Sequence, residues 1–191
     1  DPFWNLDADL RPQMRDEVDR ILRETATTAV FVTHDQEEAF TLADRVGVLQ
    51  AGRVEQMAPP QQVYHRPAPR FVASFLGAAD FLPGVVGREG IVTEVGTFAN
   101  VDRLPEGQPV EVMIRPDDIS FVPEASGAGT ITRRYFRGPA TVYCVRLPSG
   151  LRVHSSQPSA SMLPTGTRVA LSAHVPHVVA FPVAVATSGG G

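Results

Sequence analysis

The stretch Thr28-Ala-Val-Phe-Val-Thr-His-Asp35 decides the fold of the first part of this 191-residue chain. Residues 28–33 are apolar or β-branched throughout and do not alternate with polar residues. This pattern is typical of a strand buried on both faces, as in a parallel sheet. His34 and Asp35 end the run. Such a strand needs a neighbouring strand on each side and a helix above and below it.

Helical spacing precedes this segment. Residues 9–24 carry one apolar stripe and polar residues elsewhere, which predicts an amphipathic helix. The stripe consists of Leu10, Met14, Val18, Ile21 and Leu22. We expect two ion pairs at i,i+4 spacing on its wet side, Asp16 with Arg20 and Asp19 with Arg23. The side chain of Asp7 or Asp9 is suited to capping the start of the helix.

The residues after the segment continue the alternation of helices and strands. We predict a helix over 36–43, a strand over 46–49, a turn at 50–53, a returning hairpin arm over 54–57, and short helices over 60–64 and 70–76. One buried strand and one hairpin cannot cover both faces of residues 29–33. Burial alone therefore predicts that the missing strands lie upstream, outside this sequence.

From residue 80 the pattern changes to short β-rich runs separated by glycine and proline. The runs are 84–87, 110–114, 119–122, 130–132, 140–145, 168–171 and 178–181. No helix of ordinary length is visible, so this part predicts a small antiparallel barrel or sandwich. The boundary between the two halves falls near Gly77 to Asp80.

Composition excludes several classes of protein. The net charge is −4, with 17 basic and 21 acidic residues, whereas nucleic-acid binders usually carry a basic excess. Cys144 is the one cysteine, so no intramolecular disulfide is possible. No apolar run approaches the roughly 18 residues of a spanning helix, and no signal peptide is visible. The chain lacks an initiator Met and is expected to begin partway through a longer protein, while residues 188–191 are expected to form a flexible tail.

Three motifs in the first half occur in a fixed order. Asp1-Pro-Phe-Trp-Asn-Leu-Asp7 resembles the end of the Walker B motif and the D-loop of ABC ATPases. Val30-Phe-Val-Thr-His-Asp-Gln-Glu-Glu-Ala39 resembles their switch-histidine segment. Residues 43–46, 52–54 and 59–67 resemble the closing pattern of that family. The resemblance covers essentially the whole first half.

The second half resembles the TOBE regulatory region of one importer group, which handles maltose, polyamines, ferric iron and sulfate. Phe81-Leu-Pro-Gly84 and Arg115-Pro-Asp-Asp-Ile119 carry this resemblance. Family members fold the region as an OB-like barrel. The implied fold is an α/β remnant of an ABC ATPase domain over 1–78, an all-β OB-like (TOBE) barrel over 79–187, and the tail.

The resemblance implies roles for particular residues. His34 matches the switch histidine that contacts the γ-phosphate of ATP, and it precedes a helix start, where anions are favoured. Asp7 matches the D-loop aspartate at the subunit interface, with Asn5 and Leu6 in the same loop. The alternatives are a histidine at a strand end without a ligand, and a plain helix cap at Asp7.

Two positions depart from the family pattern. Asp1 precedes Pro2, where the family carries the catalytic glutamate, and its side chain is one methylene shorter. Either aspartate replaces glutamate, or a residue is missing, or Asp1 is a cloning remnant. Trp4 replaces the usual small residue of the D-loop and is expected to pack on a neighbour.

The larger departure is the absence of other motifs. The sequence contains no Gly-x-x-x-x-Gly-Lys-Ser/Thr and no Leu-Ser-Gly-Gly-Gln. Phosphoryl transfer depends on positioning and electrostatics. We therefore expect no tight ATP binding and no hydrolysis by this chain alone. ATP and Mg²⁺ are expected only in the intact protein, which would act with a second copy and with permease subunits at the cytoplasmic face of the membrane, importing ferric iron or a polyamine.

Other features of the second half leave alternatives open. Arg115, with Asp117 and Asp118, is either part of a regulatory ligand site or a turn with a surface ion pair. The barrel is either a regulatory and dimerisation domain or a free-standing module that senses a small ligand. A nucleic-acid barrel would use Arg133, Arg134 and Arg137, but the acidic balance argues against it. His154, His174 and His177 are too scattered to predict a metal site.

Overall fold

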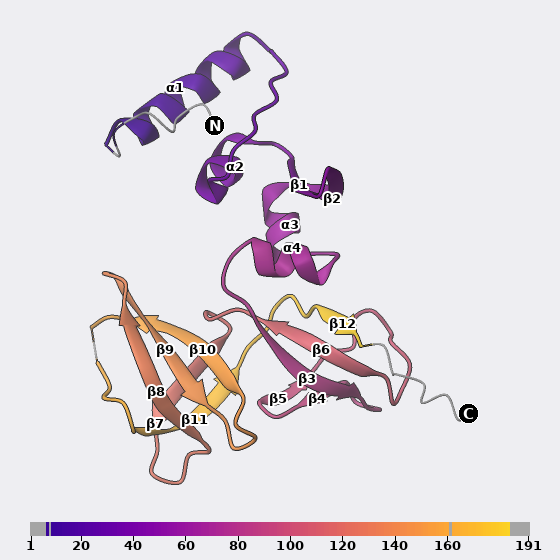
Figure 1. Cartoon of the computed structure of the whole chain (residues 1–191), viewed down its shortest axis with the longest axis vertical. Helices are drawn as coiled ribbons and strands as arrows, with labels where there is room; N and C mark the ends of the chain where they lie inside the picture. Colours follow the sequence, from indigo (N-terminus) through magenta and orange to yellow (C-terminus); the bar gives the residue numbers. More distant parts are fainter. Residues whose placement is uncertain (1–6, 8, 161, 184–191) are drawn as a thin grey trace. The chain divides into compact units, whose positions relative to one another are not determined.

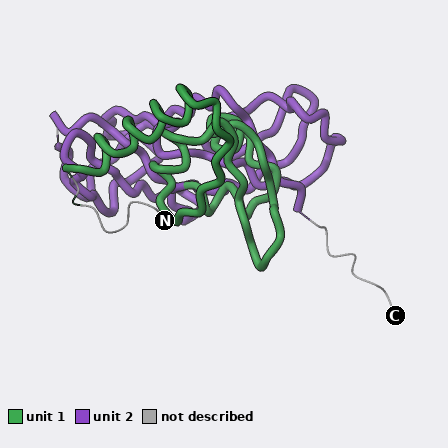
Figure 2. Tube along the Cα trace, turned by 90° about the horizontal axis from the view of Figure 1, so that it is seen from above, with its two compact units in different colours: residues 1–76 green, residues 77–191 purple. Residues whose placement is uncertain are grey.

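The chain divides into two compact units, Asp1–Leu76 and Gly77–Gly191, which Figure 2 colours separately. The structure is a computed structural model, and it describes residues 7, 9–160 and 162–183. The first unit holds helices and one hairpin, and the second unit is built from strands (Figure 1). The chain is therefore mostly β-sheet.

The first unit follows the predicted order of helices and hairpin. Its elements are α1 (Leu10–Glu24), α2 (Gln36–Leu42), β1 (Val46–Gln50), β2 (Arg53–Ala58), α3 (Pro60–His65) and α4 (Arg70–Phe75). Strands β1 and β2 pair antiparallel around a turn in which Ala51 and Gly52 both have positive φ. A small core joins them to the short helices: Val46, Val48, Ala58, Val63, Val72 and Leu76. Within the described residues no helix is long and apolar enough to cross a membrane.

The buried strand predicted over residues 28–33 is not formed. Residues 27–33 have no regular secondary structure, and the side chains of Val30 and Val32 are 89% and 79% exposed. Backbone groups join a sheet only when a neighbouring strand supplies donors and acceptors. No strand among the described residues pairs with this segment. The residues whose composition predicted a doubly buried strand are therefore irregular in backbone and largely exposed.

The apolar stripe of α1 is likewise uncovered. Leu10, Met14 and Ile21 are exposed, whereas Arg15 is the residue of α1 that is buried. The ion pair of Arg23 with Asp19 is confirmed at 2.8 Å. The prediction that Asp16 pairs with Arg20 is wrong, because Arg20 instead contacts Glu17 at 2.6 Å and Glu24 at 2.7 Å.

The capping prediction for α1 is also wrong. Asp9 occupies the N-cap position in the helical region of backbone space, and its side chain makes no capping hydrogen bond. The helix start is satisfied by the backbone carbonyl of Asp7, which accepts from the N–H groups of Leu10 and Arg11.

The second unit contains two five-stranded antiparallel sheets (Figure 1). One has the order β12-β6-β3-β4-β5, and the other has the order β10-β9-β8-β11-β7. The strands are β3 (Asp80–Val86), β4 (Ile91–Thr93), β5 (Gly96–Phe98), β6 (Pro109–Ile114), β7 (Ile119–Pro123), β8 (Gly129–Phe136), β9 (Ala140–Arg146), β10 (Arg152–Pro158), β11 (Arg168–Ala173) and β12 (Ala180–Pro182). The all-β prediction for this half is confirmed.

Three of these strands are missing from the sequence prediction. β4 and β5 are three residues each and join into a hairpin, so their pattern is too short to read. β10 has the sequence Arg-Val-His-Ser-Ser-Gln-Pro, which places small polar residues where apolar ones usually signal a buried face. Its inward positions are Val153 and Ser155, both fully buried. Burial of a serine hides the alternation that would reveal the strand.

Side chains from both sheets form one continuous core. The cluster includes Leu82, Val110 and Val112 from one sheet and Tyr143, Val145 and Val169 from the other. Apolar burial of this kind contributes about 25 cal/mol for each Å² removed from water, which makes it the main stabilising contribution. The two sheets thus stabilise each other.

We expect Val145→Ala to lower the free energy of unfolding of the second unit by about 2 kcal/mol, since it leaves a cavity in this core. Val145 is fully buried, whereas Val122 on β7 is 61% exposed. Val122→Ala deletes the same two methyl groups, and its effect is expected to stay within about 0.5 kcal/mol. Urea unfolding followed by circular dichroism measures both. Equal effects of the two substitutions would contradict the described packing.

Candidate functional site

The turn from Thr33 to Glu38 surrounds the predicted switch histidine. The hydroxyl of Thr33 donates to Glu38 Oε2 at 2.7 Å and accepts from the backbone N–H of Asp35 at 3.0 Å. His34 lies between these residues in a bend, with an exposed side chain. The hydrogen bonds on either side therefore fix the backbone from which His34 projects.

Asp35 is the N-cap of α2. Its Oδ1 accepts from the N–H of Glu37 at 2.8 Å and from the N–H of Glu38 at 3.3 Å. A carboxylate in this position satisfies the donors of the first turn and suits the helix dipole. These donors are thus already used. The anion at this helix start is the carboxylate of Asp35 itself, and the role of His34 stays a prediction.

An arginine from α1 reaches this turn. Arg15 contacts Glu37 Oε1 at 3.0 Å, Asp35 Oδ2 at 3.8 Å and Glu38 Oε1 at 4.0 Å. The side chain of Arg15 is 7% exposed and that of Glu38 is 4% exposed. The sequence analysis did not single out Arg15. Its signal is faint, because one arginine beside an apolar stripe looks like an ordinary polar-face residue.

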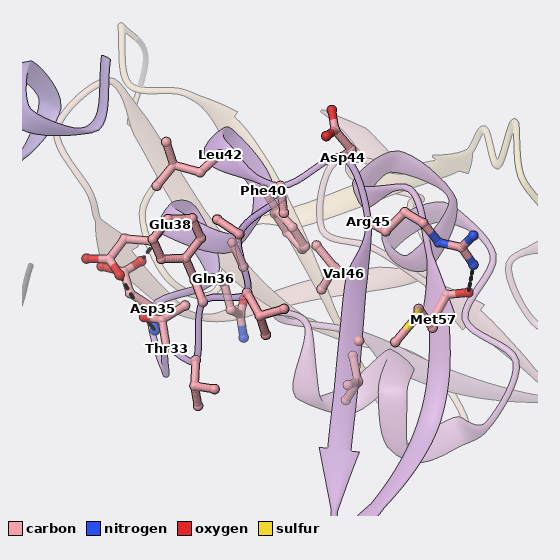
Figure 3. A pocket seen from close by; sticks show the side chains of 18 of the residues that line it. Thr33, Asp35, Gln36, Glu38, Phe40, Leu42, Asp44, Arg45, Val46 and Met57 are labelled. Atoms are coloured by element: carbon pink, nitrogen blue, oxygen red, sulfur yellow. Dashed lines mark hydrogen bonds between the residues drawn. The ribbon is translucent and has the colours of Figure 1, made fainter. Parts of the chain in front are cut away.

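An apolar cavity of about 790 Å³ lies against the exposed segment. Residues of α1, of 26–35, of α2, of β1 and of β2 line it, together with Phe75 and Leu76. Figure 3 shows Thr33, Asp35 and Glu38 together at one side of it, and Arg45 reaching the carbonyl of Met57 at the other. Residues 28–33, which the sequence predicts to be covered by further strands, line this cavity.

The D-loop prediction falls mostly outside the described part of the chain. Asp1, Asn5 and Leu6 lie outside the described residues. Asp7 is described and is exposed just ahead of α1. Its backbone carbonyl accepts from Leu10 N at 3.0 Å and from Arg11 N at 3.2 Å, at the start of the helix.

Arg115 and Asp117 do not come together in the second unit. Arg115 is buried, and its Nη1 donates to the carbonyl of Ala78 at 3.2 Å. Asp117 is exposed. The backbone N–H of Arg115 donates to Asp118 Oδ2 at 2.8 Å, and Asp118 N donates back to the carbonyl of Arg115 at 3.0 Å. The segment is a turn as predicted, but the side chain of Arg115 is buried in the interior and does not lie at the surface.

This turn also receives bonds from other strands. Ser156 N on β10 donates to the carbonyl of Pro116 at 2.7 Å, and His174 N donates to the carbonyl of Asp118 at 2.8 Å. These bonds tie the turn between β6 and β7 to β10 and to the end of β11. Backbone groups of Pro116 and Asp118 thus help to hold the turn, while a regulatory ligand site at Arg115 and Asp117 stays a prediction.

The remaining candidates are scattered. His154 Nδ1 lies 2.9 Å from Asp80 Oδ1, a contact between β10 and β3 that the sequence analysis missed. Arg134 Nη1 donates to the carbonyl of Leu163 at 3.2 Å. No group of three metal-ligating side chains occurs in residues 7, 9–160 and 162–183. The histidines of this unit therefore form no cluster in the part of the chain that the structure describes.

Comparisons with known proteins give one family match and several similar proteins. The TOBE domain family matches residues 112–181, from β6 to β12. The chain is 43% identical over 133 residues to the sulfate/thiosulfate import ATP-binding protein of Chromobacterium violaceum, covering 70% of this chain and 37% of that protein. It is 36% identical over 185 residues to a spermidine/putrescine import ATP-binding protein of Pseudomonas aeruginosa, covering 90% and 50%. The chain is thus similar to ABC importer ATP-binding subunits, and its second unit matches the TOBE domain family.

The TOBE domain and the helical unit together span at most about half the length of these relatives. The sn-glycerol-3-phosphate import ATP-binding protein of Chromohalobacter salexigens, 46% identical over 132 residues, is covered to 35% of its length and 68% of this chain. Among solved structures, the cytoplasmic molybdate-binding protein ModG with molybdate bound matches at a TM-score of 0.41 and 14% identity, covering 53% of this chain and 94% of ModG. That likeness is too distant to carry an argument about a ligand.

Asp118 in the TOBE domain gives a testable pH dependence. Desolvation raises its pKa above the ordinary 3.8, the N–H of Arg115 opposes this, and the neighbouring Asp117 adds to it. The folded protein therefore binds more protons than the unfolded chain between pH 3.8 and the raised value. Through this group, the free energy of unfolding falls as pH rises across that window.

We expect Asp118→Asn to remove this contribution while keeping an oxygen for the N–H of Arg115. Unfolding by urea at a series of pH values from about 3.5 to 7 measures the slope. The control is Asp102→Asn, which makes the same change at an exposed position. If both variants keep the wild-type slope, desolvation of Asp118 in the folded domain is refuted.

Proposed function

We propose that this chain is the C-terminal part of the ATP-hydrolysing subunit of a bacterial ABC importer. The observation that carries the proposal is the joint presence of the switch-histidine segment and a TOBE domain in a relative of import ATP-binding proteins. In this proposal the first unit is the end of an ABC ATPase domain and the second is an OB-like regulatory barrel. His34 would act as the switch histidine, and Asp7, with Asn5 and Leu6, as the D-loop.

The uncovered surface of the first unit supports this proposal. The exposed segment at 28–33, the exposed stripe of α1 and the 790 Å³ cavity are all apolar, and isolated soluble domains rarely leave such surfaces open. Strands from the rest of an ATPase domain would cover them and would turn residues 28–33 into the inner strand that their composition predicts.

The residues of this chain do not fit ATP and Mg²⁺ by themselves. The sequence has no glycine-rich cradle, and the first-turn donors of α2 are bound by Asp35. Asp35, Glu37 and Glu38 also place three carboxylates beside His34, against one arginine. This turn alone therefore does not supply the positive charge that would hold a polyphosphate, which would have to come from the rest of an intact subunit. In an intact subunit, ATP would supply the phosphoanhydride bond that is cleaved. The residues of this chain would hold His34 in position.

We propose further that the intact subunit works as a homodimer, joined to permease subunits at the cytoplasmic face of the membrane, with the TOBE domain helping to pair the two copies. For the solute, a polyamine takes first place, because the spermidine/putrescine relative matches 90% of this chain. Ferric iron is the other solute predicted from the sequence, but none of the three relatives described above is named for iron.

We expect His34→Ala in the full-length subunit to lower kcat of ATP hydrolysis by roughly a hundredfold or more, because it removes a donor aimed at charge that develops in the transition state. A coupled phosphate-release assay measures kcat and KM. His65→Ala is the control, since His65 is an exposed histidine on α3 of the same unit. Wild-type turnover in the His34 variant would refute the switch role.

We expect calorimetric titration of this 191-residue chain with Mg-ATP to release no binding heat, since no phosphate cradle is present in the sequence. The full-length subunit, titrated in the same buffer, is the positive control and should bind. Micromolar binding by the 191-residue chain would show that a nucleotide site exists in it, and would overturn this part of the proposal.

A further inference from the structure

The docking of α1 onto α2 depends on an arginine. Arg15 is 6% exposed, while the apolar residues Leu10, Met14 and Ile21 of the same helix are more than 40% exposed. Helices usually dock through their apolar stripe. Here the buried point of α1 is a cation, and it lies against the turn that contains His34.

Each carboxylate that Arg15 meets has its own task in that turn. Asp35 caps α2 by accepting from two backbone N–H groups. Glu38 accepts the hydroxyl hydrogen of Thr33, the residue before His34. Glu37 is 78% exposed and makes the shortest contact with Arg15, at 3.0 Å. The guanidinium thus lies against three carboxylates of this loop, and its link to Thr33 runs through Glu38.

We propose that Arg15 is the positioning residue for His34. By neutralising Asp35 and Glu38, it keeps the hydrogen bonds of the turn closed and fixes the direction in which His34 projects. This inference rests on the proposed switch role of His34 and names the residue that sets it.

Energetics favour a positioning role over a stabilising one. Burying an arginine costs desolvation energy, and an apolar side chain of similar size in its place is often as stable. Arg15 Nε is also buried without a hydrogen-bond partner among the described residues. What an apolar residue cannot do is balance the carboxylate of Glu38, which is 4% exposed.

Removal of the cation has a defined consequence. Without Arg15, the buried carboxylate of Glu38 loses its counter-charge, and an uncompensated buried charge is strongly unfavourable. Glu38 then moves toward solvent, its bond with Thr33 opens, and the backbone around His34 gains freedom. A displacement of about 1 Å of a reacting group is enough to slow an enzyme by roughly a hundredfold.

The test uses the full-length subunit with four substitutions. Arg15→Gln removes the charge, Arg15→Lys keeps it without the planar fork, and Thr33→Val removes the hydroxyl that bridges the turn. Arg20→Gln is the matched control, because Arg20 is on the same helix and forms its ion pairs with Glu17 and Glu24, both of which are exposed. Hydrogen exchange of the peptide covering residues 33–42, and kcat and KM of ATP hydrolysis, are measured for each.

We expect Arg15→Gln and Thr33→Val to speed exchange in this peptide and to lower kcat between tenfold and a hundredfold with little change in KM. Arg15→Lys should fall between wild type and Arg15→Gln. Arg20→Gln should match wild type in both readouts.

Two results overturn the inference. Either exchange in residues 33–42 is the same in Arg15→Gln and Arg20→Gln, or exchange rises and kcat does not fall. Failure of the proposed function has a different signature: His34→Ala then leaves kcat unchanged, whereas the exchange measurement still decides whether Arg15 holds the turn.

Discussion

Residues 28–33 are apolar or β-branched and have an irregular backbone, and no strand in the described part of the chain pairs with them. Val30 and Val32 are almost fully exposed as a result, and the stripe of α1 is exposed beside them. Everything unusual about the first unit follows from this lack of cover: the irregular backbone at 27–33, the apolar cavity, and a small core confined to the hairpin and short helices. The second unit, which has two complete faces to pack together, buries a continuous core.

Buried arginines organise the polar parts of both units. Arg15 meets three carboxylates beside His34, and Arg115 reaches the carbonyl of Ala78 from the turn between β6 and β7. In each case a guanidinium, with several donors in a fixed plane, joins segments that are distant in the sequence. The net stabilisation from either contact is small, because burying a guanidinium costs desolvation free energy. Both restrict a loop to one arrangement, which is the property that a functional or structural turn needs.

The relatives give these features a common setting. Import ATP-binding proteins match the chain over both units, and the TOBE domain family covers most of the second. A subunit of this kind would supply the missing strands and the phosphate cradle, and it would place the switch turn against nucleotide. In such a subunit, residues 28–33 would form an inner strand. The end of that strand would set the position of His34, so the apolar face and the polar turn at 33–38 would depend on each other.

The sequence by itself determined the helices and hairpin of the first unit and the β-rich character of the second, because these depend on local periodicity and on turn residues such as Gly52. It also predicted, from burial, that residues 28–33 require strands this chain does not provide. It could not reveal β10, whose buried Ser155 breaks the apolar alternation. Nor could it show that Arg15 is buried and Asp117 exposed. Those outcomes belong to the tertiary structure, because the burial and pairing of a charged side chain depend on which distant segments fold against it and not on its neighbours in sequence.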